Sequence, residues 1–247
     1  MPRPETDTTN TMPQNSTDAI GHFSNYVAQF DAYYQQRPEF EERMALWGGL
    51  LDKYAVPGGT AIDMGCGTGV FSLYLAAKGA QVVGVDGAAE MVAFCNERRL
   101  ERHLDNVRFM QGRLPTIDES GLSPADLLIS SSVVEYVPDL DATLRLFARL
   151  VKPGGTLIVS MPNASSVSRC YERLRYRLTG EPAIYRHILH FTSPSGLQAR
   201  LQRHGFVSLE AHHYTHYTRA AKLARAVGLP PALTEDLFVA VFRKAAR

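Results

Sequence analysis

The sequence predicts an α/β fold in which helices cover both faces of a parallel sheet. Short apolar runs such as TAIDM, QVVGVD and TLIVSMP alternate with amphipathic stretches along most of the chain. Turn residues separate them: Pro153-Gly154-Gly155 stands between a helical stretch and an apolar run, and Gly205 follows the stretch that ends at His204. Strands buried on both faces read as continuous apolar runs, and parallel neighbours need crossover segments, so the alternation favours this fold.

Length and composition are those of one globular domain. A chain of 247 residues can form a full α/β core without a second domain. Hydrophobic residues make up 45% of the chain and charged residues 21%, and the longest apolar runs are too short to cross a bilayer. The net charge of +1 supplies no general field for nucleic acid, which we therefore do not expect as a partner.

The N-terminal region is predicted to contain a disordered tail and a helical leader. Residues 1–18 are polar and have no periodic apolar set, so the folded domain is expected to span 19–247. Two leader helices are predicted within 20–54, where apolar side chains recur at three- and four-residue steps on either side of Pro38. The first twenty residues lack the apolar core of a signal peptide, and the three cysteines have no C-x-x-C spacing, which together predict a cytoplasmic protein.

The elements after the leader are predicted from the same alternation of apolar runs and amphipathic stretches. A longer insertion, 162–192, follows the fifth strand, and a second long connection, 217–235, joins the last two strands. The predicted order is strand 60–64, helix 70–78, strand 81–86, helix 88–102, strand 106–110, strand 125–130, helix 140–151, strand 156–162, helix 194–204, strand 206–214 and strand 235–244.

A glycine-rich turn follows the first strand and opens the first helix after it. Gly65, Gly67 and Gly69 allow a tight turn and a close approach of a ligand to the backbone, and the unpaired amides at the helix start favour an anionic group. Asp86 ends the next strand, where its carboxylate can accept both hydroxyl protons of a ribose. The alternative role for Asp86 is to cap the helix that begins near Ala88.

The loop fits a methionine-bearing nucleoside better than a dinucleotide. The dinucleotide pattern G-x-G-x-x-G needs a third glycine where this chain has Val70. Asp63, just ahead of the glycines, would repel a pyrophosphate and attract a cationic amino group. A dinucleotide-dependent oxidoreductase is therefore the weaker alternative.

Five motifs in order resemble those of class I S-adenosylmethionine-dependent methyltransferases. They are DMGCGTG at 63–69, the strand 82–86, FMQGRLP at 109–115, ADLLISSSVVEYV at 125–137 and LVKPGGTL at 150–157. The resemblance implies a Rossmann-like sheet of seven strands with an antiparallel last strand, and S-adenosylmethionine bound at the carboxyl ends of the strands. The cofactor-binding residues that it implies are Asp63, Gly65, Cys66, Gly67, Gly69, Asp86, Gly87, Met91, Gly112, Arg113, Leu114 and Ser131.

Two positions depart from the family pattern. Arg113 stands where an acid usually accepts a hydrogen bond from the adenine amine, and arginine has donors only. Arg113 is expected either to stack on the adenine or to face solvent. Tyr136 stands where the family has histidine, so a histidine base cannot act there. Tyr136 is expected either to orient the methyl acceptor or to pack at the strand end.

Two variable segments are expected to form the acceptor pocket. Tyr26 and Tyr33 on the leader are candidate substrate contacts, with core packing as the alternative. Arg169 and Arg173 lie on one face of a basic amphipathic helix within 165–178. That face is expected to be solvated, to clamp an anionic substrate or carrier, or to contact an anionic lipid surface.

His190 is the candidate general base, because its loop should face the cofactor end of the sheet. The other C-terminal histidines lack zinc spacing, and no metal is expected. The predicted function is methyl transfer to a small molecule, most simply to a phenol, quinol or natural-product hydroxyl. The alternatives are N- or C-methylation of a small metabolite and a non-catalytic, cofactor-binding scaffold, and the chain is a candidate homodimer.

Overall fold

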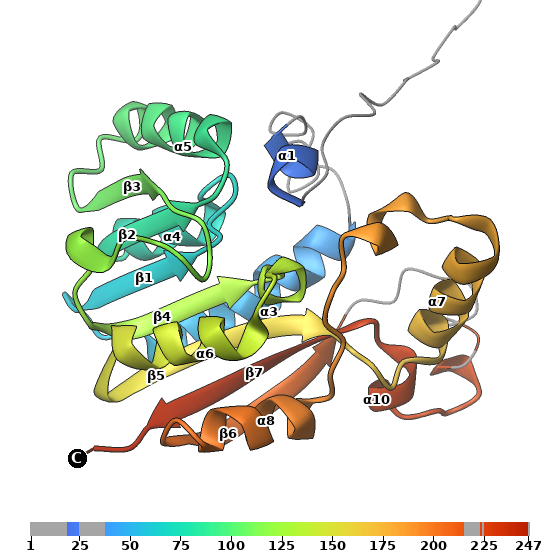
Figure 1. Cartoon of the computed structure of the whole chain (residues 1–247). Helices are drawn as coiled ribbons and strands as arrows, with labels where there is room; N and C mark the ends of the chain where they lie inside the picture. Colours follow the sequence, from blue (N-terminus) through green and yellow to red (C-terminus); the bar gives the residue numbers. More distant parts are fainter. Residues whose placement is uncertain (1–18, 25–37, 215–222, 224, 247) are drawn as a thin grey trace, which may run out of the picture.

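The computed structural model describes residues 19–24, 38–214, 223 and 225–246, which form one seven-stranded sheet flanked by helices (Figure 1). The strand order is β3-β2-β1-β4-β5-β7-β6, and all neighbours are parallel except β7, which runs antiparallel to β5 and β6. The predicted fold class, including its antiparallel last strand, is therefore confirmed. The strands are β1 (Thr60–Met64), β2 (Gln81–Asp86), β3 (Val107–Gln111), β4 (Ala125–Ser131), β5 (Val151–Pro162), β6 (Phe206–Tyr214) and β7 (Leu237–Lys244).

Helices cover the two faces of the sheet. One apolar core lies between the sheet and α6 and α8, and a second lies between the opposite face and α3, α4 and α5. No described helix is long and apolar enough to span a membrane. The helices are α1 (Ala19–Ser24), α3 (Pro38–Tyr54), α4 (Val70–Ala77), α5 (Ala89–Glu101), α6 (Leu140–Leu150), α7 (Val167–Thr179), α8 (Pro194–Gln202) and α10 (Pro231–Thr234), with short 3-10 turns η1 (Glu119–Gly121), η2 (Val134–Tyr136) and η3 (Ala183–Arg186).

The predicted boundaries agree with the structure to within a few residues, with one instructive difference at β5. This strand begins at Val151, five residues earlier than expected, because the Pro-Gly-Gly segment lies inside it as an irregularity. Val151 pairs with Ala125 and Thr156 pairs with Leu127, so the residues between them bulge out of register. The predicted tail 1–18 and leader segment 25–37 lie outside the described residues, while α3 falls within the predicted leader 20–54 and α1 begins one residue before it.

Helix α3 is anchored to the sheet by a buried tryptophan. Trp47 is fully buried and stacks on Phe71 of α4, with ring centroids 4.9 Å apart. Its indole Nε1 donates to the hydroxyl of Tyr214 at the end of β6, at 3.5 Å. The same helix therefore contacts both halves of the sheet, and it presents Arg43 one turn earlier toward the strand ends.

Replacing Trp47 by alanine should lower the free energy of unfolding by about 3–5 kcal/mol, because it removes a large buried side chain and leaves a cavity. Urea unfolding followed by far-UV circular dichroism measures the change, since Trp47 is the single tryptophan and its fluorescence is lost with it. Leu100→Ala on α5 is the control: Leu100 is 62% exposed, and its loss should change stability by less than about 0.5 kcal/mol. Equal effects of the two changes would contradict the anchoring role.

Candidate functional site

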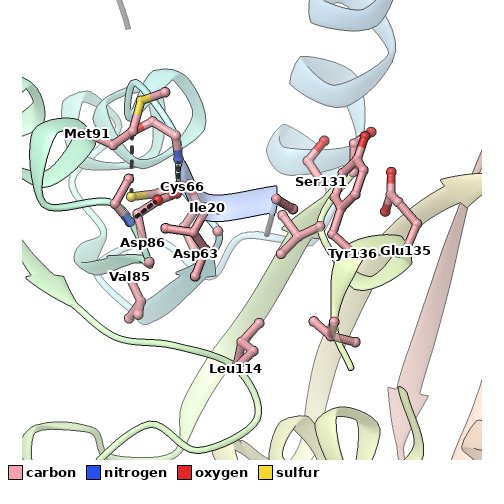
Figure 2. Close-up of a pocket in the computed structure, with 18 of the residues that line it drawn as sticks. Ile20, Asp63, Cys66, Val85, Asp86, Met91, Leu114, Ser131, Glu135 and Tyr136 are labelled. Carbon is pink, nitrogen blue, oxygen red and sulfur yellow. Dashed lines mark hydrogen bonds between the residues drawn. The ribbon is translucent and has the colours of Figure 1, made fainter. Parts of the chain in front are cut away.

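A cavity of about 400 Å³ lies at the carboxyl ends of β1, β2 and β4. The strand order reverses direction between β1 and β4, which is where open α/β sheets form their ligand crevice. Most of the predicted site residues line it (Figure 2). Those that do are Asp63, Gly65, Cys66, Gly67, Asp86, Gly87, Met91, Gly112, Arg113, Leu114, Ser131, Tyr136 and Arg169.

The glycine loop is held in a conformation that other residues would strain. Gly65, Gly67 and Gly69 have φ angles of +77°, +54° and +75°. A Cβ on Gly65 would lie 2.2 Å from a methyl group of Val133, so this glycine is needed for close packing as well as for its backbone angle. Gly69 is not on the cavity wall; it precedes α4 and packs against the Cys95 sulfur and the Phe109 ring.

Asp86 links the end of β2 to the glycine loop. Its Oδ2 accepts from the amide of Gly67 at 2.8 Å, and its Oδ1 accepts from the amide of Ala88 at 2.9 Å. Burial raises the pKa of Asp86, against the lowering effect of these backbone hydrogen bonds. The sequence offered two roles for Asp86, ligand binding and helix capping. Its side chain lines the cavity, as the first role requires, and it also accepts from an amide at the start of α5, as the second requires.

Asp63 is a deeply buried acid of the cavity, with 1% of its surface exposed. The hydroxyl of Ser72 donates to its Oδ2 at 2.7 Å. Burial, helped by the negative charge of Asp86, raises the pKa of Asp63 to about 7, while the Ser72 hydrogen bond and the charge of Arg43 act in the opposite direction. A cationic group beside Asp63 would relieve the cost of ionising it.

The opposite end of the cavity contains two charged side chains that the sequence did not single out. Glu135 in η2 is 1% exposed and lies beside Tyr136 and Ser131 (Figure 2). Arg43 on α3 donates from Nη2 to the Ser131 hydroxyl at 2.6 Å. Glu135 was visible only as part of the fourth-strand motif, and Arg43 belongs to a helix almost ninety residues away from its partner in sequence, so no local pattern pointed to it.

An amphipathic helix usually buries its apolar face and exposes its charged face, but α7 turns Arg169 inward and exposes its apolar face. Arg169 faces the protein and lines the cavity, and Arg173 lies over the Phe191 ring at 4.7 Å, away from the cavity wall. The prediction of a solvated arginine face is therefore wrong for Arg169, whereas Arg173 is partly exposed. The apolar residues opposite them are exposed instead, among them Tyr171, Leu174 and Leu178.

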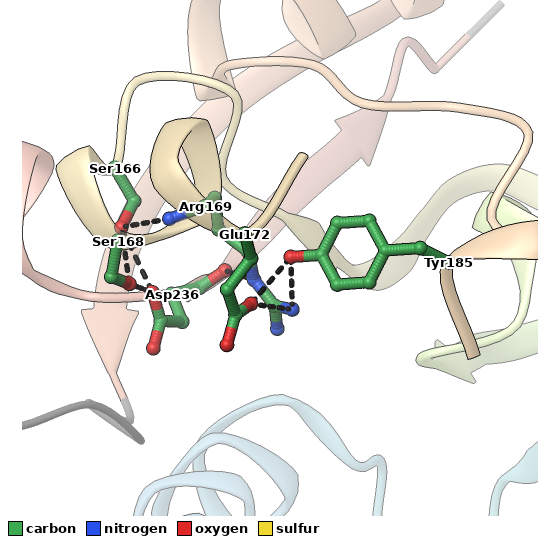
Figure 3. A network of polar contacts seen from close by, with 6 residues as sticks. All are labelled: Ser166, Ser168, Arg169, Glu172, Tyr185 and Asp236. Atoms are coloured by element: carbon green, nitrogen blue, oxygen red, sulfur yellow. Dashed lines mark hydrogen bonds and ion pairs between the residues drawn. The ribbon is translucent and has the colours of Figure 1, made fainter. Parts of the chain in front are cut away.

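A polar network explains why Arg169 faces inward (Figure 3). Its Nη1 donates to the hydroxyl of Tyr185 at 3.0 Å and forms an ion pair with Glu172 at 3.4 Å. Its Nε donates to the carbonyl oxygen of Asp236 at 3.2 Å, and the carboxylate of Asp236 accepts from the Ser166 hydroxyl at 2.9 Å. These contacts satisfy the buried guanidinium with partners from η3 and the start of β7.

Among the described candidates for the acceptor end, His190 is not brought to the cavity wall. Nε2 of His190 donates to the carbonyl oxygen of Val137 at 2.8 Å, and the ring does not line the cavity, so the structure gives no support to its proposed role as a base. Tyr26 and Tyr33 lie outside the described residues. The predicted cofactor-binding residues other than Gly69 thus lie together on the cavity wall, and of the described catalytic and substrate-binding candidates Tyr136 and Arg169 lie there with them.

The fold and the cavity define a nucleoside-binding α/β domain, and comparison with known proteins identifies its family. A family model described as a methyltransferase domain matches residues 55–197, more than half of the chain. The chain therefore belongs to the S-adenosylmethionine-dependent methyltransferases, with S-adenosylmethionine as the cofactor of the family.

Similar curated proteins are named ubiquinone biosynthesis O-methyltransferases. The protein from Xanthomonas campestris is 28% identical over 81% of this chain and 83% of its own length. The protein from Serratia proteamaculans is 33% identical over 48% of this chain, but the match spans only 46% of that relative. Among solved structures, an S-adenosylmethionine-dependent methyltransferase from Mesorhizobium loti superposes with a TM-score of 0.60 at 20% identity, covering 81% of this chain and 98% of that one, which is a likeness of fold.

Proposed function

We propose that the protein methylates a hydroxyl group of a small molecule, such as a phenol or quinol. The observation that carries this proposal is a single cavity with two different ends. Asp63 and Asp86 form one end around the glycine loop, and Ser131, Glu135 and Tyr136 form the other. A cofactor held at the first end would present its reactive group toward an acceptor at the second.

The residues at the first end fit the chemistry of the cofactor. Asp86 is a carboxylate on the cavity wall with acceptor capacity beyond its backbone hydrogen bonds, so it can accept from a ribose hydroxyl, and Asp63 suits the cationic amino group of the methionine part. Backbone groups between Gly112 and Leu114 would contact the adenine, since the side chain of Arg113 cannot accept from its amine. When bound, S-adenosylmethionine supplies a positively charged sulfonium with an electrophilic methyl group.

Oxygen is favoured over nitrogen as the acceptor atom by two observations. The similar curated proteins are named O-methyltransferases. The acceptor end of the cavity also contains Arg43 and Arg169, whose positive charges disfavour a cationic amine. N- or C-methylation and a non-catalytic scaffold remain the alternatives, and turnover of hydroxyl, amine and carbon acceptors with a radiolabelled methyl donor distinguishes them.

Asp86→Asn should weaken the binding of S-adenosylhomocysteine by about 10- to 100-fold, since hydrogen bonds to charged groups contribute about 1.5–3 kcal/mol. Isothermal titration calorimetry of the native protein and the variant measures the change. Glu90→Gln is the matched control, because it removes a carboxylate from the exposed start of α5 and should leave the affinity unchanged. Equal affinity of native protein and Asp86→Asn would rule out the ribose contact, and no binding by the native protein would overturn the proposed function.

The affinity for S-adenosylhomocysteine should rise about tenfold between pH 6 and pH 8. Asp63 has a pKa of about 7 in the free protein, so it is mostly protonated at pH 6 and mostly ionised at pH 8, and only the ionised form attracts the ligand's ammonium group. Calorimetry at pH 7 in two buffers of different ionisation enthalpy should show proton release on binding. Asp63→Asn should bind more weakly and with a flat pH dependence; a flat profile for the native protein would contradict the contact.

The outward face of α7 is proposed as a contact with an anionic lipid surface. Val167, Tyr171, Leu174 and Leu178 expose between 49% and 77% of their surface along one side of the helix. Arg175 and Arg177 are also exposed on the same helix, so apolar contact and positive charge occur together. This combination suits a peripheral helix at an anionic lipid interface, and a quinol acceptor with an apolar tail would be reached from the same surface.

Native protein should co-sediment with phosphatidylglycerol vesicles more strongly than with phosphatidylcholine vesicles. Leu174→Gln combined with Leu178→Gln should reduce the bound fraction at least about tenfold, because two exposed leucines lose their apolar contact with the acyl chains. Leu100→Gln, at an exposed position on α5, should have no effect. A dimer that the double variant dissociates, without any vesicle binding, would assign this face to a second copy of the chain instead.

A further inference from the structure

Glu135 is a buried acid whose carboxylate is incompletely paired. It lies in η2, directly after the end of β4, and its Oε2 accepts no hydrogen bond from the part of the chain that the structure describes. The backbone around it is fixed, since its carbonyl oxygen accepts from the amides of Leu189 and His190 at 2.8 and 3.2 Å. The side chain lines the cavity beside Tyr136 and Ser131, as Figure 2 shows.

A buried, incompletely paired acid destabilises the folded protein unless a bound ligand donates a hydrogen bond or a proton to it. Burying an ionised carboxylate without a full set of donors is unfavourable, and proteins usually pair such a group or replace it. Burial raises the pKa of Glu135 to about 7, while the positive charges of Arg43 and Arg169 act in the opposite direction. A carboxylate held near neutrality in a ligand cavity is the arrangement expected of a group that exchanges protons.

The charges around Glu135 define which acceptor it can serve. Arg43 reaches the cavity from α3 and Arg169 from α7, while Asp63 and Asp86 occupy the cofactor end on β1 and β2. The two arginines disfavour an ammonium group and stabilise the negative charge that develops on an oxygen losing its proton. Apolar side chains, including Ile184 and Ile188, complete the wall on that side and exclude water from the acceptor.

We propose that Oε2 of Glu135 accepts the proton of the acceptor's hydroxyl group, in particular an acidic phenolic or quinol hydroxyl. In this step the acceptor O–H bond breaks and its proton passes to Oε2. The acceptor's oxygen, freed of its proton, forms the new bond to the methyl carbon, and the sulfur–carbon bond breaks with its electron pair left on sulfur, giving a neutral thioether. Glu135 then releases the proton to solvent. The inference rests on the proposed function and adds its acid-base residue.

The sequence pointed to His190 as the general base, and this inference assigns that role to Glu135 instead. The Nε2 atom of His190 is engaged with the carbonyl oxygen of Val137, and the ring is not on the cavity wall. Tyr136 lines the cavity, but an unionised phenol is a weak base at neutral pH. Among the described residues at the acceptor end, Glu135 is the acidic side chain that lines the cavity there.

Glu135→Gln tests the proposal because it keeps the size of the side chain and removes its basicity. The native protein, Glu135→Gln, Glu135→Asp and the surface control Glu90→Gln are assayed on a panel of phenols, catechols and hydroquinones with a radiolabelled methyl donor. We expect kcat to fall at least about 100-fold in Glu135→Gln, the typical contribution of a general base, and to be partly restored in Glu135→Asp. With S-adenosylmethionine saturating at every pH, so that ionisation of Asp63 does not enter, the native kcat/KM for the acceptor should rise with pH up to about 7, and the variant should lose this limb.

Two further readouts do not depend on turnover. Affinity for S-adenosylhomocysteine should stay within about twofold in Glu135→Gln, since Glu135 lies at the acceptor end. The melting temperature of the variant minus that of the native protein should become more positive as the pH rises from 5 to 8. The folded native protein holds a proton on Glu135 that the unfolded chain releases at lower pH, so native stability falls as pH rises through this window, and glutamine removes that loss.

The outcomes separate this inference from the proposed function. Unchanged turnover in Glu135→Gln, or a lower melting temperature of the variant at pH 8, would overturn the acid-base role and make Glu135 a structural residue. Methylation by native protein of amines alone, or of no phenol in the panel, while S-adenosylhomocysteine still binds, would overturn the hydroxyl acceptor and leave the cofactor site standing. Absence of S-adenosylhomocysteine binding would overturn the proposed function itself.

Discussion

The shape of the cofactor end depends on hydrogen bonds between the end of β2 and the glycine loop. The carbonyl oxygen of Val85 accepts from the amides of Gly65 and Cys66 at 2.7 and 2.9 Å, and Asp86 accepts from Gly67 at 2.8 Å. Three successive amides are therefore fixed by two successive residues of a neighbouring strand. The parallel pairing of β1 with β2 sets this geometry, because it brings Met64 opposite Val85. A shift in that register would move the loop and remove the cavity wall.

The cavity is electrostatically divided, and the division follows the fold. Strand ends supply the acids Asp63 and Asp86, whereas the arginines come from α3 and α7, outside the sheet. Both acids have raised pKa values because burial makes their charges costly, and the charge of Asp86 raises the pKa of Asp63 further. A cationic cofactor lowers that cost, so binding at this end is coupled to ionisation of the site. The acceptor end contains Arg43 and Arg169, so it disfavours a cationic ligand and favours an acceptor that becomes negative as it reacts.

The sequence was sufficient for the fold and the cofactor end because both are local patterns. Strand and helix periodicity is visible within single elements, and the glycine loop and Asp86 lie within two consecutive strand-helix units. The acceptor end is assembled from separate segments: Arg43, Glu135 and Arg169 are distant in sequence and meet only in the folded chain. Periodicity also showed that α7 has two faces but could not tell which one turns inward, since Arg169 is held by Tyr185 of η3 and by Asp236, the residue just before β7.

The inverted helix α7 shows why polar contacts, and not apolar burial, determine the acceptor end. Apolar packing tolerates many similar arrangements, whereas a buried guanidinium has few positions in which its donors are satisfied. Arg169 is satisfied only when α7, Tyr185 and Asp236 hold their observed positions, so the network of Figure 3 fixes the wall of the cavity opposite Glu135. Most residues of that network belong to the insertion 162–192, with Asp236 joining from just before β7, so the insertion determines where the Arg169 guanidinium lies on the cavity wall. Acceptor selection is therefore expected to change with the insertion while cofactor binding stays the same.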